Sequence, residues 1–238
     1  MQRVALVTGA TSGIGLDLTR TLLRRGYAVV ALSRRATARA SLPAHERLVV
    51  QDGDVADPAA AARAVETALA RFDGLDLVVN NAGIFLAKPF VDYTPEDLAA
   101  LVATNLHGFV HVTQAALRAM LPRGRGHIVN IGTSLAAQPI AGVPSALPIL
   151  IKGGIEAATR SLAIEHAALG IRVNTIAAGI IDTPMHAQGD PRALAQLSPA
   201  GRIGRPDEIS AAVLYLDAAE FVSGEVLHVD GGAHAGRW

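Results

Sequence analysis

Short apolar runs rich in β-branched residues alternate along the chain with longer, alanine-rich segments of helical periodicity. Seven such runs predict strands, at residues 4–7, 28–32, 48–50, 75–79, 127–131, 172–176 and 226–229. Strands that are apolar on both faces and are separated by helices are typical of a parallel sheet covered on both sides. The pattern therefore predicts an α/β protein with a doubly wound, seven-stranded parallel sheet.

The segments between these strands carry the predicted helices. One follows the first strand and is amphipathic, and the others span residues 58–70, 95–105, 108–120, 145–168 and 206–216. No stretch has the composition of a linker, so we expect a single domain over residues 1–238. Residues 179–205 carry Gly, Pro, Asp and Gln among few apolar residues. A loop of that length inside a compact domain is typical of a functional lid, which we place at about 179–205.

Composition excludes several classes of function. The 21 basic and 21 acidic residues cancel, which argues against nucleic acid or an anionic membrane as a partner. The chain has no cysteine, so it has no thiolate nucleophile and no disulfide, and no histidine or carboxylate spacing predicts a metal site. We find no signal peptide and no apolar run of membrane-spanning length, and we expect a soluble, cytoplasmic protein that acts on a small molecule.

A glycine-rich turn joins the first strand to the first helix and is the strongest local motif. The sequence TGATSGIG places Gly9, Gly13 and Gly15 between them. Glycines suit this position because the turn is tight and a phosphate must approach the backbone and the free N–H groups of the helix. The motif predicts a dinucleotide site that also includes Thr11, Ser12 and Ile14.

The end of the second strand predicts which dinucleotide is bound. An NAD-binding protein usually has an acidic residue there to bind the adenosine ribose, whereas this chain has Ser33 followed by Arg34 and Arg35. A carboxylate would repel the 2′-phosphate of NADP, and arginines can pair with it. We therefore expect NADP(H) as the cofactor.

Motifs along the whole chain resemble the short-chain dehydrogenase/reductase family, in the family's order and spacing. They are TGATSGIG, the Asp54-Val55 pair, NNAG at residues 80–83, Asn105, NIGTS at residues 130–134, and the C-terminal run from GRIGRPDEI to VDGG. The resemblance implies a Rossmann fold in which Asp54 and Val55 contact adenine and Thr183 meets the nicotinamide amide. It also implies cofactor contacts for Asn81, Ala82, Gly83, Lys152, Gly179 and Ile181, and a homotetramer joined partly through the helix at 145–168.

The family's chemistry uses a tyrosine as proton donor or acceptor, a lysine four residues later, a hydroxyl and an asparagine. By this resemblance the lysine is Lys152, the asparagine is Asn105, and the hydroxyl is that of Thr133 or Ser134. The residue four before Lys152, however, is Pro148. A proline in the first turn of a helix is structurally tolerated, so the substitution removes chemistry without breaking the fold.

Two functions remain open on the sequence. One is an NADP(H)-dependent oxidoreductase that acts on a small carbonyl or alcohol, an imine or an activated alkene. Its proton would come from Thr133 or Ser134 through water, from Lys152 through the ribose hydroxyl of the cofactor, from His186 in the lid, or from solvent. The other is a catalytically silent NADP(H)-binding protein that serves as a redox sensor or a structural partner.

Overall fold

The computed structural model describes residues 2–34, 42 and 44–236. Seven strands form one parallel sheet in the order β3-β2-β1-β4-β5-β6-β7, which confirms the predicted architecture. The strands are β1 (Val4–Thr8), β2 (Ala28–Ser33), β3 (Leu48–Asp52), β4 (Leu77–Asn80), β5 (Gly126–Thr133), β6 (Ile171–Ala178) and β7 (Val226–Val229). The strand order reverses beside β1, and this opens a crevice at the carboxyl ends of the strands.

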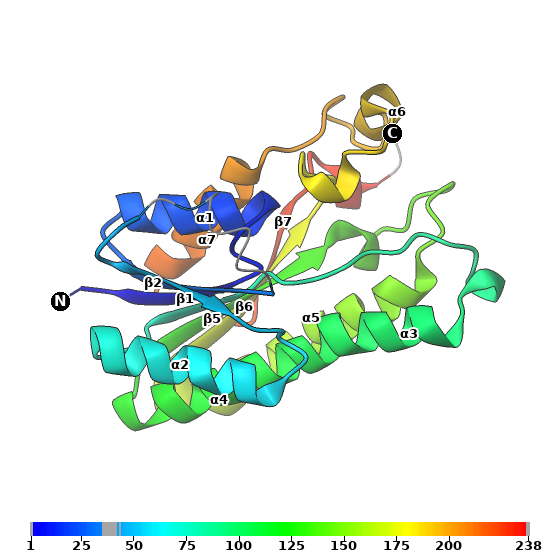
Figure 1. Ribbon diagram of the computed structural model, residues 1–238. Coiled ribbons are helices and arrows are strands. Elements are labelled where there is room, and N and C mark those ends of the chain that lie inside the picture. The colour runs from blue at the N-terminus through cyan, green and yellow to red at the C-terminus, as the bar shows by residue number, and fades with distance from the viewer. Residues whose placement is uncertain (1, 35–41, 43, 237–238) are drawn as a thin grey trace.

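Helices cover both faces of the sheet. In Figure 1, α1 and α7 lie together on one face, and α2, α4 and α5 lie on the other. The α-helices are α1 (Gly13–Arg24), α2 (Pro58–Phe72), α3 (Pro95–Leu101), α4 (Gly108–Met120), α5 (Ala146–His166), α6 (Pro191–Ala195) and α7 (Pro206–Ala218). Single turns of 3₁₀-helix are η2 (Phe90–Asp92), η4 (Leu121–Arg123), η5 (Ser134–Ala136), η6 (Ala167–Leu169), η7 (Pro184–His186) and η8 (Ala233–Ala235).

Two predicted segments differ in detail. The helix expected at 95–105 is α-helical only to Leu101, and residues Val102–His107 form a π-helical turn, η3, before α4. The lid at 179–205 was expected to be irregular, but it contains η7, α6 and an isolated parallel bridge between Ile181 and Gly204. Helix α6 forms because the Asp190 side chain accepts a hydrogen bond from the backbone N–H of Arg192, two residues later.

Two hydrophobic layers hold the helices to the sheet. One joins alternate residues of the strands to Leu18 and Leu22 of α1 and Ile209 and Val213 of α7. The other joins the opposite face to α2 and α4. Both consist largely of Ala, Val, Ile and Leu, as the low aromatic content predicts.

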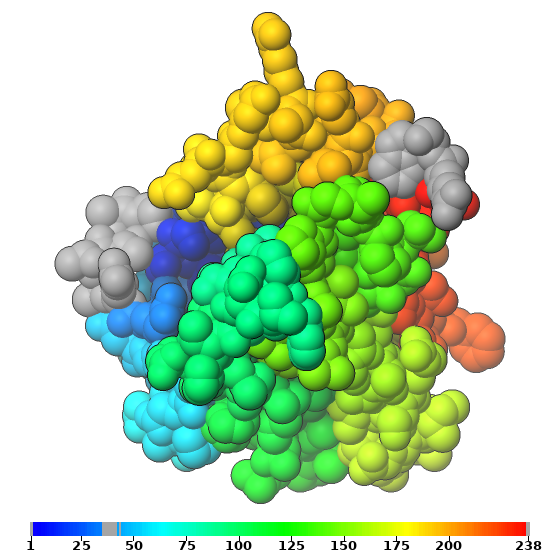
Figure 2. Space-filling view, turned by 90° about the vertical axis from the view of Figure 1, so that its right-hand side faces the viewer, coloured from blue at the N-terminus to red at the C-terminus, as the bar shows by residue number. Residues whose placement is uncertain are grey.

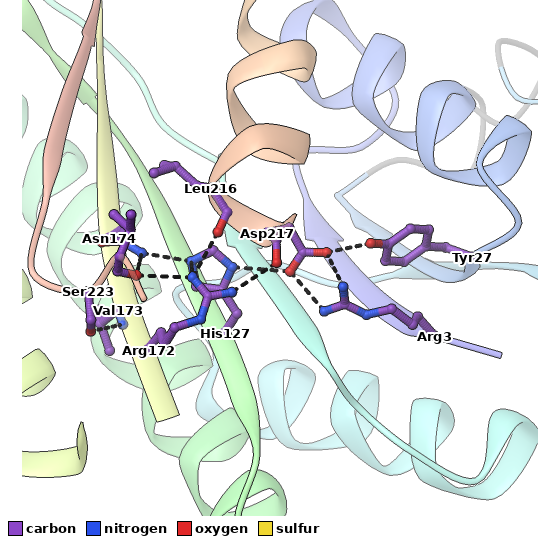
Figure 3. A network of polar contacts seen from close by, with 10 residues as sticks. Arg3, Tyr27, His127, Arg172, Val173, Asn174, Leu216, Asp217 and Ser223 are labelled. Carbon is purple, nitrogen blue, oxygen red and sulfur yellow. Dashed lines mark hydrogen bonds and ion pairs between the residues drawn. The ribbon is translucent and has the colours of Figure 1, made fainter. Parts of the chain in front are cut away.

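A buried polar network ties the amino ends of the strands to α7, on the edge of the sheet away from the crevice (Figure 3). The Asp217 carboxylate accepts hydrogen bonds from Tyr27 Oη, from the Arg3 guanidinium at 2.7 and 2.9 Å, and from His127 Nδ1 at 3.2 Å. Asn174 Nδ2 donates to His127 Nε2 at 3.0 Å. His127 is therefore a satisfied core residue that joins β5 to β6 and α7.

Candidate active site

The glycine-rich turn between β1 and α1 has backbone geometry that other residues rarely adopt. Gly9 and Gly13 have φ angles of +64° and +50°. A Cβ on Gly15 would lie 2.3 Å from the carbonyl oxygen of Gly9 and 2.5 Å from Nδ2 of Asn81. The turn thus brings bare backbone and the amino end of α1 to the crevice, which fits the pyrophosphate of a dinucleotide.

One cavity of about 600 Å³ at the carboxyl edge of the sheet gathers most of the predicted site residues. Its lining includes Gly9, Ser12, Gly13, Ile14, Ser33, Arg34, Asp54, Val55, Asn81, Ala82, Gly83, Thr133, Ser134, Lys152, Gly179, Ile181, Thr183 and His186. Of the predicted residues that the structure describes, Thr11, Gly15 and Asn105 do not line this cavity. Gly15 instead lets α1 pack against Gly9 and Asn81.

The end of β2 forms the part of the cavity expected to hold the adenosine ribose. Ser33 and Thr11 share a 2.7 Å hydrogen bond between their hydroxyls, which places Thr11 behind Ser33. Arg34 is exposed and lines the cavity, so its guanidinium is available to a phosphate. Arg35 lies outside the described residues. Asp54 faces the same end of the cavity and accepts a hydrogen bond from the backbone N–H of Ala56 at 2.9 Å.

Asn105 lies inside the π-helical turn η3 and is buried. Its side-chain amide forms two hydrogen bonds with the backbone of Ile84. Oδ1 accepts from the N–H and Nδ2 donates to the carbonyl oxygen, both at 2.9 Å. Asn105 and Lys152 also border a small second cavity of about 20 Å³, a volume close to that of one water molecule. Asn105 therefore shapes the segment after β4 and the space beneath Lys152, and does not face the large cavity.

Lys152 projects from α5 to the end of β5. Its Nζ donates a 2.6 Å hydrogen bond to the carbonyl oxygen of Ile131, and it borders both cavities. Burial lowers the pKa of Lys152 to about 8, although the negative charge of Glu156 acts in the opposite direction. A lysine with a pKa near neutrality can hold or release a proton under ordinary conditions.

Two hydroxyls lie beside this lysine, where β5 passes into η5. Thr133 Oγ1 accepts from the backbone N–H of Leu135 at 3.4 Å, which leaves its O–H free to donate. Ser134 is buried as a residue but borders the cavity. The site thus has two hydroxyl groups and an ammonium that can stabilise negative charge on a substrate oxygen.

His186 comes to the cavity from the lid. Its Nδ1 lies 2.8 Å from the carbonyl oxygen of Ile181, which fixes the ring and requires the proton on Nδ1. Among the described residues, His186 Nε2 has no hydrogen-bond partner, and the ring lines the cavity.

None of the three tyrosines borders the cavity formed by the described residues. Tyr27 binds Asp217 at the far edge of the sheet, Tyr93 Oη donates to the carbonyl oxygen of Leu86 at 2.6 Å, and Tyr215 is exposed on α7. Tyr93 is therefore engaged in the segment before α3.

Pro148 is the third residue of α5, as predicted, and is buried. Ser145 precedes this helix, but its hydroxyl does not cap it and donates instead to the carbonyl oxygen of Val143 at 3.1 Å. The backbone of Ser145 still begins the helix by accepting from the N–H of Ile149. A proline at the third position loses no intrahelical bond there.

Most of the remaining cavity wall is apolar, and few of its residues are marked by a sequence motif. Three segments supply it: the one after β4, the one after β5 and the lid. In Figure 2 the yellow lid lies above the green segments that follow those two strands. The apolar lining residues are Ile84, Phe85, Ala87, Leu135, Ile140, Val143, Ile180, Met185, Leu194 and Leu197. No periodicity marks residues in such loops, so only the fold brings them together.

The described residues contain no group of three or more histidine, aspartate or glutamate side chains arranged to hold a metal ion. Nor do they include a helix with the length and apolar character needed to cross a membrane.

Comparison with known proteins identifies the family. Residues 9–234 match the family model described as enoyl-(acyl carrier protein) reductase. The cis-4-hydroxycyclohexanecarboxylate dehydrogenase of Sinomonas cyclohexanicum is 41% identical over 243 residues, covering 97% of this chain and 96% of that protein. The 3-oxoacyl-(acyl-carrier-protein) reductase of Vibrio cholerae serotype O1 is 34% identical, covering 98% and 97% of the two chains.

A solved structure extends the match to three dimensions. A gluconate 5-dehydrogenase from Burkholderia cenocepacia, in complex with NADP and tartrate, superposes with a TM-score of 0.90 at 34% identity. The superposition covers 100% of this chain and 97% of that one. The glycine-rich turn at the strand crossover and the cation at the end of β2 fit the same cofactor, NADP(H). With relatives matched over nearly its whole length, this chain belongs to the short-chain dehydrogenase/reductase family of oxidoreductases.

Proposed function

We propose that this oxidoreductase transfers hydride between NADP(H) and a small carbonyl or alcohol, imine or activated-alkene substrate, with a proton source other than tyrosine. The observation that carries the proposal is the composition of one cavity. Lys152, Thr133 and Ser134 border it beside the end of β5, whereas each tyrosine of the chain lies elsewhere. Pro148 occupies the helical position one turn before Lys152 where the family has its phenol.

The polar groups of the site suit charge stabilisation at a substrate oxygen. NADPH, when bound, supplies the hydride. Thr133 can donate its O–H to that oxygen, and the Lys152 ammonium adds positive charge in a partly buried setting, where both effects exceed their strength in water.

The loss of the phenol slows the reduction of some substrates more than that of others. General acid catalysis contributes about 10² to 10⁴ in rate, so reduction of a simple ketone is slowed by this order. A protonated imine carries its own proton, and an activated alkene takes up its proton at carbon after hydride transfer. Both depend less on an acid at oxygen.

Two protein groups can supply the proton. Lys152 is charged at neutral pH because its pKa is lowered only to about 8, and it borders the same cavity as Thr133. His186 approaches from the lid with its Nδ1 committed to Ile181, which leaves Nε2 as the exchanging atom. We favour Lys152 because it is held by a 2.6 Å hydrogen bond on the rigid end of β5, whereas His186 is carried by a short turn of the lid.

The apolar wall limits the substrate class. Apart from Lys152 and His186, the charged or titratable side chains that line the cavity are Arg34, Asp54 and Asp230. Arg34 and Asp54 border the end expected to hold adenosine. A compact substrate with an apolar body therefore fits the lid half of the cavity best.

The test is oxidation of NADPH over a panel of small ketones, imines and enones, with product identified by mass spectrometry. Lys152→Met is expected to lower kcat by a factor of at least about 10² without changing the fold. His186→Phe is expected to change KM more than kcat. If His186→Phe abolishes kcat while Lys152→Met retains it, the proton source is the histidine. Tight NADPH binding with no turnover of any substrate would favour the silent cofactor-binding protein instead.

A further inference from the structure

A second ionisable side chain lies buried behind the active site and has no place in the chemistry described above. Glu156, on α5, is only 9% exposed. Its Oε1 atom is buried and has no hydrogen-bond partner among the described residues. A buried carboxylate oxygen without a partner costs stability, so its presence calls for a physical reason.

The position of Glu156 links it to Lys152. The two residues are four apart on α5, so they lie on the same side of the helix, one turn from each other. Glu156 also packs behind the end of β5: a Cβ on Gly132 would come within 3.2 Å of Glu156 Oε1, and Gly132 precedes Thr133 in the chain. The carboxylate thus lies directly behind the strand end that carries the site hydroxyl.

The charges around this pair are few. Burial raises the pKa of Glu156, and the positive charges of Arg160 and Lys152 partly oppose this. Glu156 in turn raises the pKa of Lys152 against the larger effect of burial. From the other elements packed against α5, which are α3, η3, η5, η6, β5 and β6, no described ionisable group acts on either residue. Among the described residues, Glu156 is therefore the charge that favours the ammonium form of Lys152.

We propose that Glu156 is a positioning residue that keeps Lys152 protonated, so that the two side chains titrate as one unit of the active site. The proposal extends the role of Lys152 in the proposed function, but it concerns the proton affinity of the lysine and can be measured without turnover. The ammonium–carboxylate form exists between the acidic titration of Glu156 and the titration of Lys152 near pH 8. Activity that depends on this form has a bell-shaped pH profile.

The titration of Lys152 can be measured directly because the chain contains only two lysines, Lys88 and Lys152. Isotope-labelled lysine gives two side-chain signals in an NMR titration, and Lys88, paired with Asp97 at 2.6 Å, is the internal reference. In the wild-type protein the Lys152 signal should show its own titration near pH 8 and a second, smaller step where Glu156 takes up its proton.

Glu156→Gln removes the charge at nearly constant volume. It should shift the Lys152 titration to lower pH by at least about half a unit, remove the acidic step, and move the alkaline limb of kcat/KM by the same amount. Glu156→Asp keeps the negative charge and should return the Lys152 titration most of the way to its wild-type pH. Glu165→Gln, on the same helix with a side chain 64% exposed, is the matched control and should change neither titration.

The outcomes separate this proposal from the proposed function. An unmoved Lys152 titration in Glu156→Gln, with any loss confined to thermal stability, would show a merely structural role and overturn the inference. If Glu156→Gln does not fold, a wild-type Lys152 signal without the acidic step overturns it equally. A protein that turns over no substrate but shows the coupled titration contradicts the proposed function alone.

Discussion

Pro148 lies one helical turn before Lys152 in α5, on the buried side of the helix, and the lysine reaches the end of β5 from there. A tyrosine at position 148 would therefore lie one helical turn from the Lys152 ammonium. Because Pro148 occupies the first turn, no intrahelical hydrogen bond depends on the residue at this position.

Pro148→Tyr should create a ketone reductase. The new phenol would lie one turn from Lys152, whose positive charge lowers the pKa of the phenol toward the working range. We expect a gain on the order of 10² or more in kcat/KM on simple ketones, measured by NADPH oxidation. Activity on the native substrate should fall, because the ring crowds the cavity.

Pro148→Phe is the matched control, because it adds the same ring without the hydroxyl. An equal gain in both variants would assign the effect to the backbone or to packing. If Pro148→Tyr folds and binds NADPH but gains nothing on any ketone, the active-site frame differs from that of the family, and the silent cofactor-binding function is favoured.

Arg34 should set the preference for NADPH. It lines the cavity after Ser33, where an NAD-dependent protein usually has a carboxylate. We expect NADPH to bind at least tenfold more tightly than NADH, which corresponds to about 1.4 kcal/mol, and Arg34→Asp to reverse this order. Calorimetry of both cofactors tests the prediction, with Arg25→Asp, exposed at the end of α1, as the control. Equal affinities in the wild-type protein would refute it.

The network around Asp217 should make the fold sensitive to acid. Burial alone would raise the pKa of Asp217, but hydrogen bonds from His127 and Tyr27 and the charge of Arg3 hold it below its ordinary value. Burial also lowers the pKa of His127, so the native histidine stays neutral. In both cases the unfolded chain binds protons more readily. Stability is therefore fully present at neutral pH and declines as pH falls below about 6.5, then further below about 4.

Asp217→Asn tests the network. It leaves Tyr27 and Arg3 without their charged acceptor and should lower the free energy of unfolding at pH 7 by about 2 to 4 kcal/mol. The decline in stability below about pH 4 should become shallower, as measured by denaturant unfolding across pH. Asp92→Asn, at an exposed position in η2, should leave both properties unchanged. An unaltered stability in Asp217→Asn would mean that the network contributes nothing net.

We expect a homotetramer. On α5, Leu150 and Ile164 are 69% and 84% exposed, which is unusual for large aliphatic side chains on one helix. Light scattering should give about four times the 24.6 kDa chain mass. Leu150→Asp with Ile164→Asp should yield smaller species, whereas Leu69→Asp on α2 should not. A wild-type monomer at micromolar concentration would contradict the prediction.

Much of the fold could be predicted from the sequence because its signals are local. Continuous apolar runs marked all seven strands, although the fourth begins at Leu77 and not at residue 75. Proline at the first helical position marked α2, α3 and α7, and in α2 and α3 it follows a capping side chain. Helix α6 was missed because five residues give no periodicity.

The site was less predictable where it depends on contacts between distant segments. The hydrogen bond of Tyr27 to Asp217 joins residues 190 positions apart, and no local sequence pattern predicts it. The contacts of Asn105 with Ile84 from within a π-helical turn were not predictable, because no residue pattern marks that geometry; its role beside Lys152 stays a prediction. Glu156 was overlooked, although its spacing of four from Lys152 on a predicted helix could have identified it.

The most direct test of hydride transfer without a phenol is stopped-flow absorbance of the NADPH-bound protein mixed with the panel of ketones, imines and enones. Our prediction is decay of the reduced-nicotinamide signal with at least one imine or enone, slower decay with matched saturated ketones, and loss of decay in Lys152→Met. A signal that stays constant with every compound, while NADPH remains tightly bound, would contradict it.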